Sequence, residues 1–537
     1  MQISAPLNHD PVPALQRIEV ASSLQIPSFH IVGLPNPEVA EARERIRAAI
    51  EASGIEFPRR RLVLNLSPSS IRKRGTGIDL AMALAILNSK SKSKSNENFQ
   101  VVAWGELGLD GTVKASGQIT RAVFSTWQGE GNVLFVPATE LEPALNAIRQ
   151  IKRSEIFSTA PPIVIPSSDL KSTWEILLKL RQRKAPILQS EFSAAGESSP
   201  VDLRPEIPAL LPLRPYLERV IALSAAGNHH LLLLGPRGTG KTHATEWLIA
   251  LQPAPEPQII LNNLLIAELR TNEKLSTCQG PPVRRVSVQS RPAALMGSAT
   301  AGAIRPGEYS LAHGGLLVAD EFLEWPRDSR ETLRDPLESG RVLLTRTLGS
   351  AELPARFTLV ANGNLCPCGG WPPELPAPAG AQGLGSSNFR CKCTLKNRST
   401  YLTRLSGPVL DRLDIVSLVL PETSKSAPKY SVNSQERKQE LREKVQAAAD
   451  FAKMNWGAPA GQLSAAQVEN FISTSPAWLK WNAQAKSQTH SAQSLRSRHK
   501  IARVALTLAA WEQKASPDLT HFTEAECYRP EALGLFS

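Results

Sequence analysis

The strongest constraint on this chain is a glycine-rich loop that lies between an apolar run and a helical run. Residues 231–242 read LLLLGPRGTGKT, which contains the pattern G-x-x-x-x-G-K-T. A strand that enters a helix through such a loop builds a phosphate site, because loop N–H groups and the positive helix N-terminus face the anion. A chance glycine-rich turn is the alternative, but the order of strand, loop and helix argues against it. The predicted phosphate-binding residues are Gly235, Pro236, Arg237, Gly238, Thr239, Gly240, Lys241 and Thr242.

Individual roles follow from the chemistry of phosphoryl transfer. Lys241 is expected to reach the β- and γ-phosphates of ATP, and the Thr242 hydroxyl to ligate Mg²⁺. Hydrolysis also needs a group that holds the metal and a group that positions water. Residues 316–321, LLVADE, end an apolar strand in two carboxylates. Asp320 is predicted to hold Mg²⁺, and Glu321 to orient or deprotonate the attacking water.

Length and composition limit the class of protein. The chain has 537 residues, enough for roughly three domains, and its 42% hydrophobic content excludes general disorder. It has no apolar run of about 18 residues, so we expect no membrane span, and its N-terminus does not resemble a secretory signal. We therefore expect a cytoplasmic protein. The net charge of +12 permits a polyanionic partner without requiring one.

The order of sequence patterns predicts an α/β protein in three parts. Residues 1–180 alternate strand-like and helix-like runs, and a Ser/Ala/Pro-rich linker follows at 181–204. Residues 205–420 carry the phosphate loop, and residues 430–537 have helical patterns. Within the first part, strands are predicted at 28–34 and 62–66, a helix capped by Asn36 and ended by Gly54, and a buried helix at 77–88.

Four of the six cysteines form two C-x-C pairs that suggest a metal site. Cys366, Cys368, Cys391 and Cys393 flank a Pro/Gly/Ser-rich insertion at 372–388, which cannot be a helix or a central strand. Four thiolates suit a structural Zn²⁺ that pins the 366–393 segment, and they leave no open position for catalysis. A disulfide pair is the alternative, disfavoured in a reducing compartment. Cys278 and Cys527 stand alone and are expected to be ordinary thiols.

The motifs together resemble AAA+ ATPases of the magnesium-chelatase-like branch, and within it the competence-associated members. The similarity rests on several segments rather than on the phosphate loop alone. They are IVGLPNPEVAEARERIRAAIEASGIEFP (31–58), PGEYSLAHGGLLVADE (306–321), RDPLESGRVLLTR (334–346), LVANGNLCPCG (359–369), YLTRLSGPVLDRLDI (401–415) and SLRSRHKIARVALTLA (494–509). The resemblance implies an AAA+ core with a parallel sheet, a C-terminal helical lid at 430–537 and a cysteine-rich zinc insertion.

The resemblance also implies further site residues. Asn364 would be the polar first sensor, although an asparagine that only turns the chain is the alternative. Arg412 would be the arginine finger that reaches the γ-phosphate of a neighbouring subunit. An Arg412 paired with Asp411 or Asp414 is the competing interpretation, and Arg404 is a second finger candidate.

Arg496 would be the second sensor, which closes the helical lid over the bound nucleotide. Its alternatives lie on the same helical segment, at Arg498, Lys500 and Arg503. An arginine acting in trans accounts for ring assembly, so we expect a homo-oligomer, with a hexamer implied by the resemblance.

The first part resembles the Lon protease domain but lacks its Ser–Lys dyad. Gly77 occupies the nucleophile position and Thr120 the lysine position. Ser67, Ser69 and Ser70 are nearby hydroxyls without an evident base, and loop polarity explains them. We expect a non-catalytic module for ring assembly or partner binding.

The function implied is ATP-driven DNA remodelling, with helicase or branch-migration activity on recombination intermediates in natural transformation. Expected partners are single-stranded or branched DNA and recombination proteins, with Arg305 and the pair Arg284–Arg285 as candidate DNA contacts. One alternative is an ATPase that remodels proteins, as in metal insertion into a tetrapyrrole. Another is a degenerate nucleotide-binding scaffold, suggested by Arg237 in place of the relatives' proline and by an altered segment upstream of the phosphate loop, at 204–220.

Overall fold

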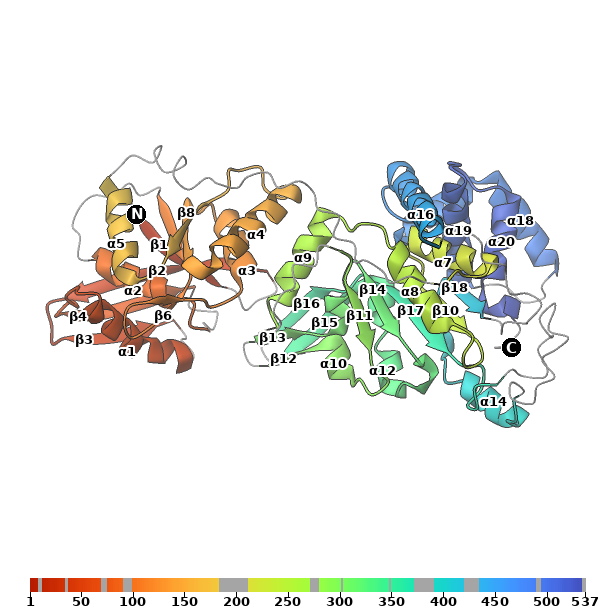
Figure 1. Ribbon diagram of the computed structural model, residues 1–537, viewed down its shortest axis with the longest axis horizontal. Helices are drawn as coiled ribbons and strands as arrows, with labels where there is room; N and C mark the ends of the chain where they lie inside the picture. Colours follow the sequence, from red (N-terminus) through yellow and green to blue (C-terminus); the bar gives the residue numbers. More distant parts are fainter. Residues whose placement is uncertain are drawn as a thin grey trace.

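The computed structural model describes residues 1–7, 12–33, 37–68, 75–89, 99–182, 211–270, 280–300, 303–346, 349–370, 391–419, 434–488 and 494–533. These residues form an N-terminal α/β domain, a central α/β domain and a group of C-terminal helices (Figure 1). Several sequence predictions lie outside the described residues. They are the Asn36 cap, Ser69 and Ser70, the linker from residue 183 onward, Cys278 and the insertion at 372–388.

The N-terminal domain is built on a mixed seven-stranded sheet. Along β4 the side chains of Leu62, Leu64 and Leu66 are buried, the period of two expected for a strand with one face on the core. Strand β2 is antiparallel to β1 and β4, and the remaining pairs are parallel. The strand order is β3 (Ser28–Val32), β4 (Arg61–Ser67), β2 (Ala14–Ser23), β1 (Gln2–Leu7), β5 (Gln100–Ala103), β8 (Val133–Pro137), β9 (Ile163–Ser167).

Helices cover this sheet, and the predicted buried helix is confirmed as α2, Asp79–Ser89. Leu80 to Leu87 of α2 are all buried, which explains why its sequence is apolar on every side. The other helices of the domain are α1 (Pro37–Ala52), α3 (Ile119–Gln128), α4 (Leu141–Arg153) and α5 (Leu170–Gln182), and a small pair of strands is formed by β6 (Glu106–Leu107) and β7 (Val113–Lys114).

The central domain contains a parallel five-stranded sheet in the order β11 (Val283–Val286), β14 (Leu316–Ala319), β17 (Thr358–Gly363), β10 (Leu231–Leu234), β18 (Ile415–Leu418). Strands β10 and β14 are buried along their whole length, as continuous apolar runs in a doubly covered sheet require. The carboxyl ends of β10, β14 and β17 meet at one edge of the sheet, where ligands bind in open α/β folds.

The remaining elements of this domain surround the sheet and include two β-hairpins. The hairpins are β12 (Gly297–Thr300) with β13 (Ala303–Pro306), and β15 (Arg341–Arg346) with β16 (Gly349–Pro354). The helices are α7 (Pro215–Gly227), α8 (Lys241–Leu251), α9 (Pro257–Ala267), α10 (Pro292–Met296), α11 (Glu308–Leu311), α12 (Arg327–Glu331), α13 (Arg334–Ser339), α14 (Leu395–Leu402) and α15 (Gly407–Leu410).

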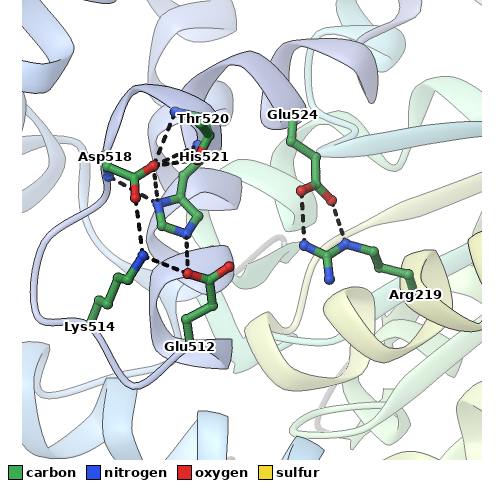
Figure 2. Close-up of polar contacts among 7 residues, drawn as sticks. All are labelled: Arg219, Glu512, Lys514, Asp518, Thr520, His521 and Glu524. Atoms are coloured by element: carbon green, nitrogen blue, oxygen red, sulfur yellow. Dashed lines mark hydrogen bonds and ion pairs between the residues drawn. The ribbon is translucent and has the colours of Figure 1, made fainter.

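The C-terminal helices share a hydrophobic core with α7, α8 and β10 of the central domain. An aromatic cluster of Trp478, Trp481 and Phe522 lies in this core, with the two indole rings 5.0 Å apart. A bidentate ion pair links the C-terminal helices to the central domain. Arg219 on α7 donates to both carboxylate oxygens of Glu524 on α20, at 2.6 and 2.8 Å (Figure 2). The helices are α16 (Ser434–Trp456), α17 (Ala465–Thr474), α18 (Pro476–Gln488), α19 (Leu495–Trp511) and α20 (Leu519–Cys527).

Helix α9 of the central domain docks on the N-terminal domain, a contact that no local sequence pattern predicts (Figure 1). Leu261 and Leu265 of α9 belong to the N-terminal hydrophobic core. The buried Glu268 accepts hydrogen bonds at 2.9 Å from the backbone N–H groups of Thr120 and Arg121, at the start of α3. A buried carboxylate thus fixes the two domains to one another.

Within the described ranges, every helix is too short or too polar to cross a lipid bilayer.

Candidate functional site

The structure confirms the strand, loop and helix that the sequence predicted around the phosphate loop. Strand β10 ends at Leu234, and α8 begins at Lys241. Gly238 and Gly240 have positive φ of 75° and 85°, a conformation that favours glycine. A Cβ on Gly235 would lie only 2.4 Å from the Val419 carbonyl oxygen, so position 235 has room for glycine but not for a residue with a side chain. These glycines shape a loop that wraps around the space in front of α8.

Lys241 is directed into this space by hydrogen bonds at the start of its helix. Its Nζ donates to the carbonyl oxygens of Gly235 and Pro236 at 2.8 and 2.7 Å, and to Asn364 Oδ1 at 3.3 Å. Burial, followed by the nearby charge of Arg237, lowers the pKa of Lys241 to about 8, and the Glu321 carboxylate opposes this shift. The structure therefore places the predicted sensor Asn364 next to the lysine of the phosphate loop.

The acidic pair lies at the end of β14, on the same edge of the sheet. Asp320 accepts a hydrogen bond of 2.7 Å from the amide of Asn362 on β17, and the same amide donates to Thr245 Oγ1 on α8 at 3.1 Å. Asn362 was missed in the sequence, although the segment VANGN places two asparagines close together. It holds the predicted metal ligand against the phosphate-loop helix.

Glu321 has an uncommon backbone conformation, with φ 49° and ψ 42°. Left-handed conformations of residues other than glycine are strained and cluster at functional sites. The conformation breaks the strand immediately after Asp320 and exposes the Glu321 side chain. An exposed carboxylate is suited to contact water beside a bound phosphate.

A cavity of 670 Å³ joins these groups. Its volume and polar lining suit a nucleotide. Arg285 also lines the cavity, but its guanidinium is paired with Glu246 at 2.6 Å. The predicted residues in the lining are Arg237, Gly238, Lys241, Thr242, Asp320, Glu321 and Asn364.

The four clustered cysteines lie beside the phosphate loop rather than at a remote surface. Their sulfur atoms all lie within 4.8 Å of one another, with Cys366 and Cys368 3.2 Å apart. Four thiols at these separations fit a tetrahedral Zn²⁺. The turn that follows Cys366 also contacts the loop, because the Arg237 N–H donates to the Gly369 carbonyl oxygen at 3.0 Å. The cysteine turn therefore supports the phosphate loop directly.

The predicted arginine finger, Arg412, and the predicted second sensor, Arg496, lie together in a different pocket. Arg496 donates to Glu338 Oε1 at 2.9 Å, and Arg412 donates to the same carboxylate. The pocket around them has a volume of 370 Å³ and contains no residue of the phosphate loop in its lining. The sequence predicts that Arg496 closes the helical lid over the bound nucleotide. In the structure Arg496 lies beside Arg412, because α19 packs on α7.

The alternatives weighed for these arginines have other partners. Arg404 pairs with Glu324 at 2.7 Å and lies over the Tyr401 ring. Asp414, suggested as a partner of Arg412, is buried and instead pairs with Lys500 at 2.8 Å. Among the second-sensor alternatives, Lys500 and Arg503 line the same pocket as Arg412 and Arg496, which we call the arginine pocket. Arg498 stacks on Trp478.

The candidate DNA contacts are divided by the structure. Arg305 is exposed on the β12–β13 hairpin. Arg284 is paired with Glu308 at 2.6 Å, as Arg285 is with Glu246, so both belong to ion pairs within the central domain.

The two positions matched by sequence to a Ser–Lys dyad, Gly77 and Thr120, are filled. A Cβ on Gly77 would lie 2.5 Å from the Trp104 ring, whose Nε1 donates to the Gly117 carbonyl oxygen at 2.7 Å. Thr120 is buried under Glu268 at the start of α3. Neither position has the group or the space that peptide hydrolysis needs.

A second group of potential metal ligands, Glu512, Asp518 and His521, lies around the N-terminus of α20 (Figure 2). Asp518 caps the helix, and its N–H donates to His521 Nδ1 at 2.9 Å. The Lys514 ammonium lies 2.7 Å from Glu512 and 3.1 Å from Asp518. A lysine already takes the position that a cation would need, so this group is a helix cap.

Comparison with known proteins connects all three parts of the chain to one family. Residues 215–427 match the model described as "Magnesium chelatase, subunit ChlI", residues 18–140 match "Subunit ChlI of Mg-chelatase", and residues 435–529 match "Magnesium chelatase, subunit ChlI C-terminal".

Full-length relatives agree with these matches. YifB of Salmonella typhimurium is 30% identical over 517 residues, which cover 95% of this chain and 93% of the relative. YifB of Escherichia coli is 29% identical over 518 residues, or 95% of this chain and 93% of the relative. The competence protein ComM of Haemophilus influenzae is 27% identical over 516 residues, which cover 96% of this chain and 94% of the relative.

Proposed function

The chain belongs to the magnesium-chelatase-like family of AAA+ ATPases, close to YifB and ComM, and we propose that it is a ring-forming ATPase that couples ATP hydrolysis to DNA remodelling. The expected reaction is branch migration or unwinding of recombination intermediates. The name of the competence protein ComM is consistent with a role in natural transformation.

One observation carries the hydrolysis part of the proposal. Lys241, Asp320, Glu321 and Asn364 come from distant segments and line one cavity beside the phosphate loop. In the proposed roles, Lys241 binds the β- and γ-phosphates, while Thr242 and Asp320 hold Mg²⁺. Glu321 and Asn364 face the attacking water. Magnesium would neutralise charge that develops on the phosphates, and Glu321 would accept a proton from water.

The arginine pocket supports assembly into a ring, proposed here as a hexamer. Arg412 and Arg496 do not line the cavity beside the phosphate loop of their own protomer. They line the arginine pocket, which shares no lining residue with that cavity. We assign both arginines to the γ-phosphate of ATP on the neighbouring protomer. An arginine supplied in trans makes hydrolysis depend on assembly.

The DNA part of the proposal is supported by charge and by the two hairpins. Strand β12 packs against β15, so the β12–β13 and β15–β16 hairpins lie side by side. Arg305 and Arg341 are exposed on them, as is Leu343, with 58% of its surface accessible. The net charge of +12 favours contact with phosphates. We place single-stranded or branched DNA on this pair of hairpins, with recombination proteins as further partners.

The cysteine cluster is proposed to hold a structural Zn²⁺. Cys366, Cys368, Cys391 and Cys393 would supply all four ligands, and the ion would join the turn after β17 to the start of α14. The N-terminal domain is proposed to be a non-catalytic Lon-protease-like module, since Gly77 occupies the position of the catalytic serine and Thr120 that of the catalytic lysine.

The test is the rate of ATP hydrolysis with and without forked or four-way-junction DNA, followed by a strand-displacement assay on a labelled junction. We expect DNA to stimulate hydrolysis and ATP to move the junction. Absence of both effects, with ATP bound normally, would exclude a DNA motor.

A second candidate is an ATPase that remodels a protein complex, as in insertion of a metal into a tetrapyrrole. The descriptions of the matched family models favour it. Recovery of tetrapyrrole-synthesis proteins with the purified chain, together with no response to DNA, would make it the better proposal. Binding of Mg·ATP without turnover under any condition would instead indicate the nucleotide-binding scaffold that Arg237 first suggested.

A further inference from the structure

The arginine pocket is unusual in its charge. Glu338 and Asp411 are the acidic residues in its lining, and they face a larger number of basic groups. Its neighbouring buried acid, Asp414, is already paired with Lys500 at 2.8 Å. The basic and imidazole side chains in the lining are His230, Arg356, Arg412, Arg496, His499, Lys500 and Arg503. Such an excess of positive charge around a 370 Å³ space is suited to an anion.

Glu338 connects the two arginines that the proposed function assigns to the γ-phosphate. Arg496 donates to both of its oxygens, at 2.9 and 3.2 Å, and Arg412 donates to Oε2. The three residues come from α13, α19 and the turn after α15, so a single carboxylate bridges the central domain and the C-terminal helices. Burial raises the pKa of Glu338, but its hydrogen bond to Arg496 and the charges of both arginines outweigh burial and lower it.

The donors of Arg412 are not exhausted by these contacts. Its Nη1 donates to the Pro408 carbonyl oxygen at 2.7 Å, and its buried Nε has no hydrogen-bond partner within the described residues. The Arg496 and Glu338 side chains are about half exposed, at 53% and 51%, so a ligand can approach from outside the protomer. Guanidinium groups bind carboxylate and phosphate oxygens with the same bidentate geometry.

From this arrangement we propose that Glu338 is an internal counter-anion, which holds Arg412 and Arg496 in the free protomer and releases them to the γ-phosphate of the neighbouring protomer's ATP. The inference rests on the proposed function and adds a positioning residue to it. The Glu338 carboxylate competes with the phosphate for the same donors. Assembly on ATP therefore requires that the Glu338 ion pairs be exchanged for phosphate contacts.

Release of Glu338 has a direct path to the hairpin that the proposed function assigns to DNA. Glu338 lies at the end of α13, and β15 starts at Arg341. Gly340 makes the connection with a φ of 69°, and its carbonyl oxygen accepts a hydrogen bond of 2.8 Å from Ala355 N, after β16. A change at Glu338 is thus transmitted to both strands of the hairpin through a short, hydrogen-bonded connection.

The experiment compares Glu338→Gln with wild-type protein and with Glu440→Gln. Glu440 is a matched control, because it is 50% exposed and pairs with two basic residues, Arg437 and Lys444, that lie outside the arginine pocket. Two quantities are measured on the full chain. They are the protein concentration at which a non-hydrolysable ATP analogue drives assembly, followed by sedimentation, and the DNA-free rate of ATP hydrolysis.

We expect Glu338→Gln to lower the concentration needed for assembly and to raise the DNA-free hydrolysis rate, each by about two- to fivefold, the range for a half-exposed ion pair. Glu440→Gln should match the wild type in both. In an Arg412→Ala, Arg496→Ala background, Glu338→Gln should have no further effect, which a merely structural role of Glu338 does not predict. If Glu338→Gln does not fold, Glu338→Asp, which withdraws the carboxylate from the arginines, should shift both quantities in the same direction.

Wild-type assembly and turnover in Glu338→Gln would overturn the proposal, and so would a loss of turnover, because a loss means that Glu338 organises the arginines for catalysis. The proposed function fails separately: if the Arg412→Ala, Arg496→Ala double variant hydrolyses ATP at the wild-type rate, neither arginine acts in trans, whatever Glu338→Gln shows.

Discussion

The N-terminal and central domains both have short loops at the carboxyl ends of their sheet strands. In the N-terminal domain a side chain fills this space, whereas in the central domain it remains an open cavity. After β5, the Trp104 ring lies against Gly77 and leaves no room for a side chain there. After β10, β14 and β17, polar side chains surround a cavity of 670 Å³. Glu268 of the central domain, moreover, closes the start of α3. An α/β sheet thus provides a place for a site, and the side chains at its edge decide whether a ligand can enter.

The largest expected effect on ligand binding lies in the central domain. Lys241→Ala should weaken Mg·ATP binding by at least about a hundredfold, because charge-assisted hydrogen bonds to the phosphates are lost. Calorimetric titration of the purified chain measures this change. Lys114→Ala, on β7 of the N-terminal domain, should bind as the wild type does, and equal weakening in both variants would contradict the contrast between the domains.

Glu321→Gln should separate binding from chemistry. Loss of the group that activates water should lower turnover by about 10²–10⁴-fold while ATP binding is kept. Steady-state hydrolysis and nucleotide binding are measured on the same preparation. Glu324→Gln, three residues further along the chain and paired with Arg404, is the control. Normal turnover in Glu321→Gln would show that another group positions the water.

In the N-terminal domain, the expected effects are on stability rather than activity. Asp79, two residues after Gly77, is fully buried beside Arg45, and burial raises its pKa from 3.8 to about 6, although Arg45 opposes the shift. Because the folded pKa is the higher one, stability is full below about pH 4 and falls as pH rises through 6. Ionisation should cost about 3 kcal/mol by pH 7, for a shift of about two pKa units.

Asp79→Asn removes this titration. Calorimetric unfolding of the full chain is measured at pH 5 and pH 7. In the wild type the midpoint temperature of one transition should be lower at pH 7 than at pH 5, and in Asp79→Asn it should be the same at both. Glu44→Gln, on the exposed face of α1, is the control and should behave as the wild type does. A transition that moves equally in all three proteins would assign the pH dependence to other groups.

The contact between the domains should also be measurable. In Glu268→Gln, one of the two buried N–H groups of α3 faces an amide NH₂, which cannot accept its hydrogen bond. We expect this change to destabilise the contact between the domains by about 2 kcal/mol. Hydrogen–deuterium exchange should rise in α3 and α9 together. Glu142→Gln, on the exposed surface of α4, should leave exchange unchanged. An increase confined to α3 would mean that the carboxylate only caps that helix.

The smallest effect is expected at the cysteine cluster. Removal of bound zinc by a chelator, or Cys391→Ser, should lower the melting temperature and weaken ATP binding by about fivefold, which corresponds to one lost hydrogen bond of about 1 kcal/mol. The reason is the bond from the Arg237 N–H to the Gly369 carbonyl oxygen. Cys527→Ser is the control. Unchanged melting with no zinc present in the purified protein would argue against a metal at this cluster.

Much of the central domain could be predicted from local patterns. The apolar run before Gly235 and the helical run after it were sufficient to place β10, the loop and α8. Asn362 was missed because nothing adjacent to it in the chain shows that its amide will reach Asp320 and Thr245. The position of Arg496 beside Arg412 could not be predicted for a similar reason, since the packing of α19 on α7 depends on residues far from either motif.

The sequence by itself determined the phosphate loop and the acidic pair after β14, because each depends on residue types at fixed short spacings. Only the tertiary structure decided which charges meet: Glu338 with Arg412 and Arg496, Asp414 with Lys500, and Glu268 with α3. The physical reason is that an ion pair or a buried carboxylate requires two groups within a few ångströms, and for residues this far apart in the chain that distance is set by how helices and sheets pack.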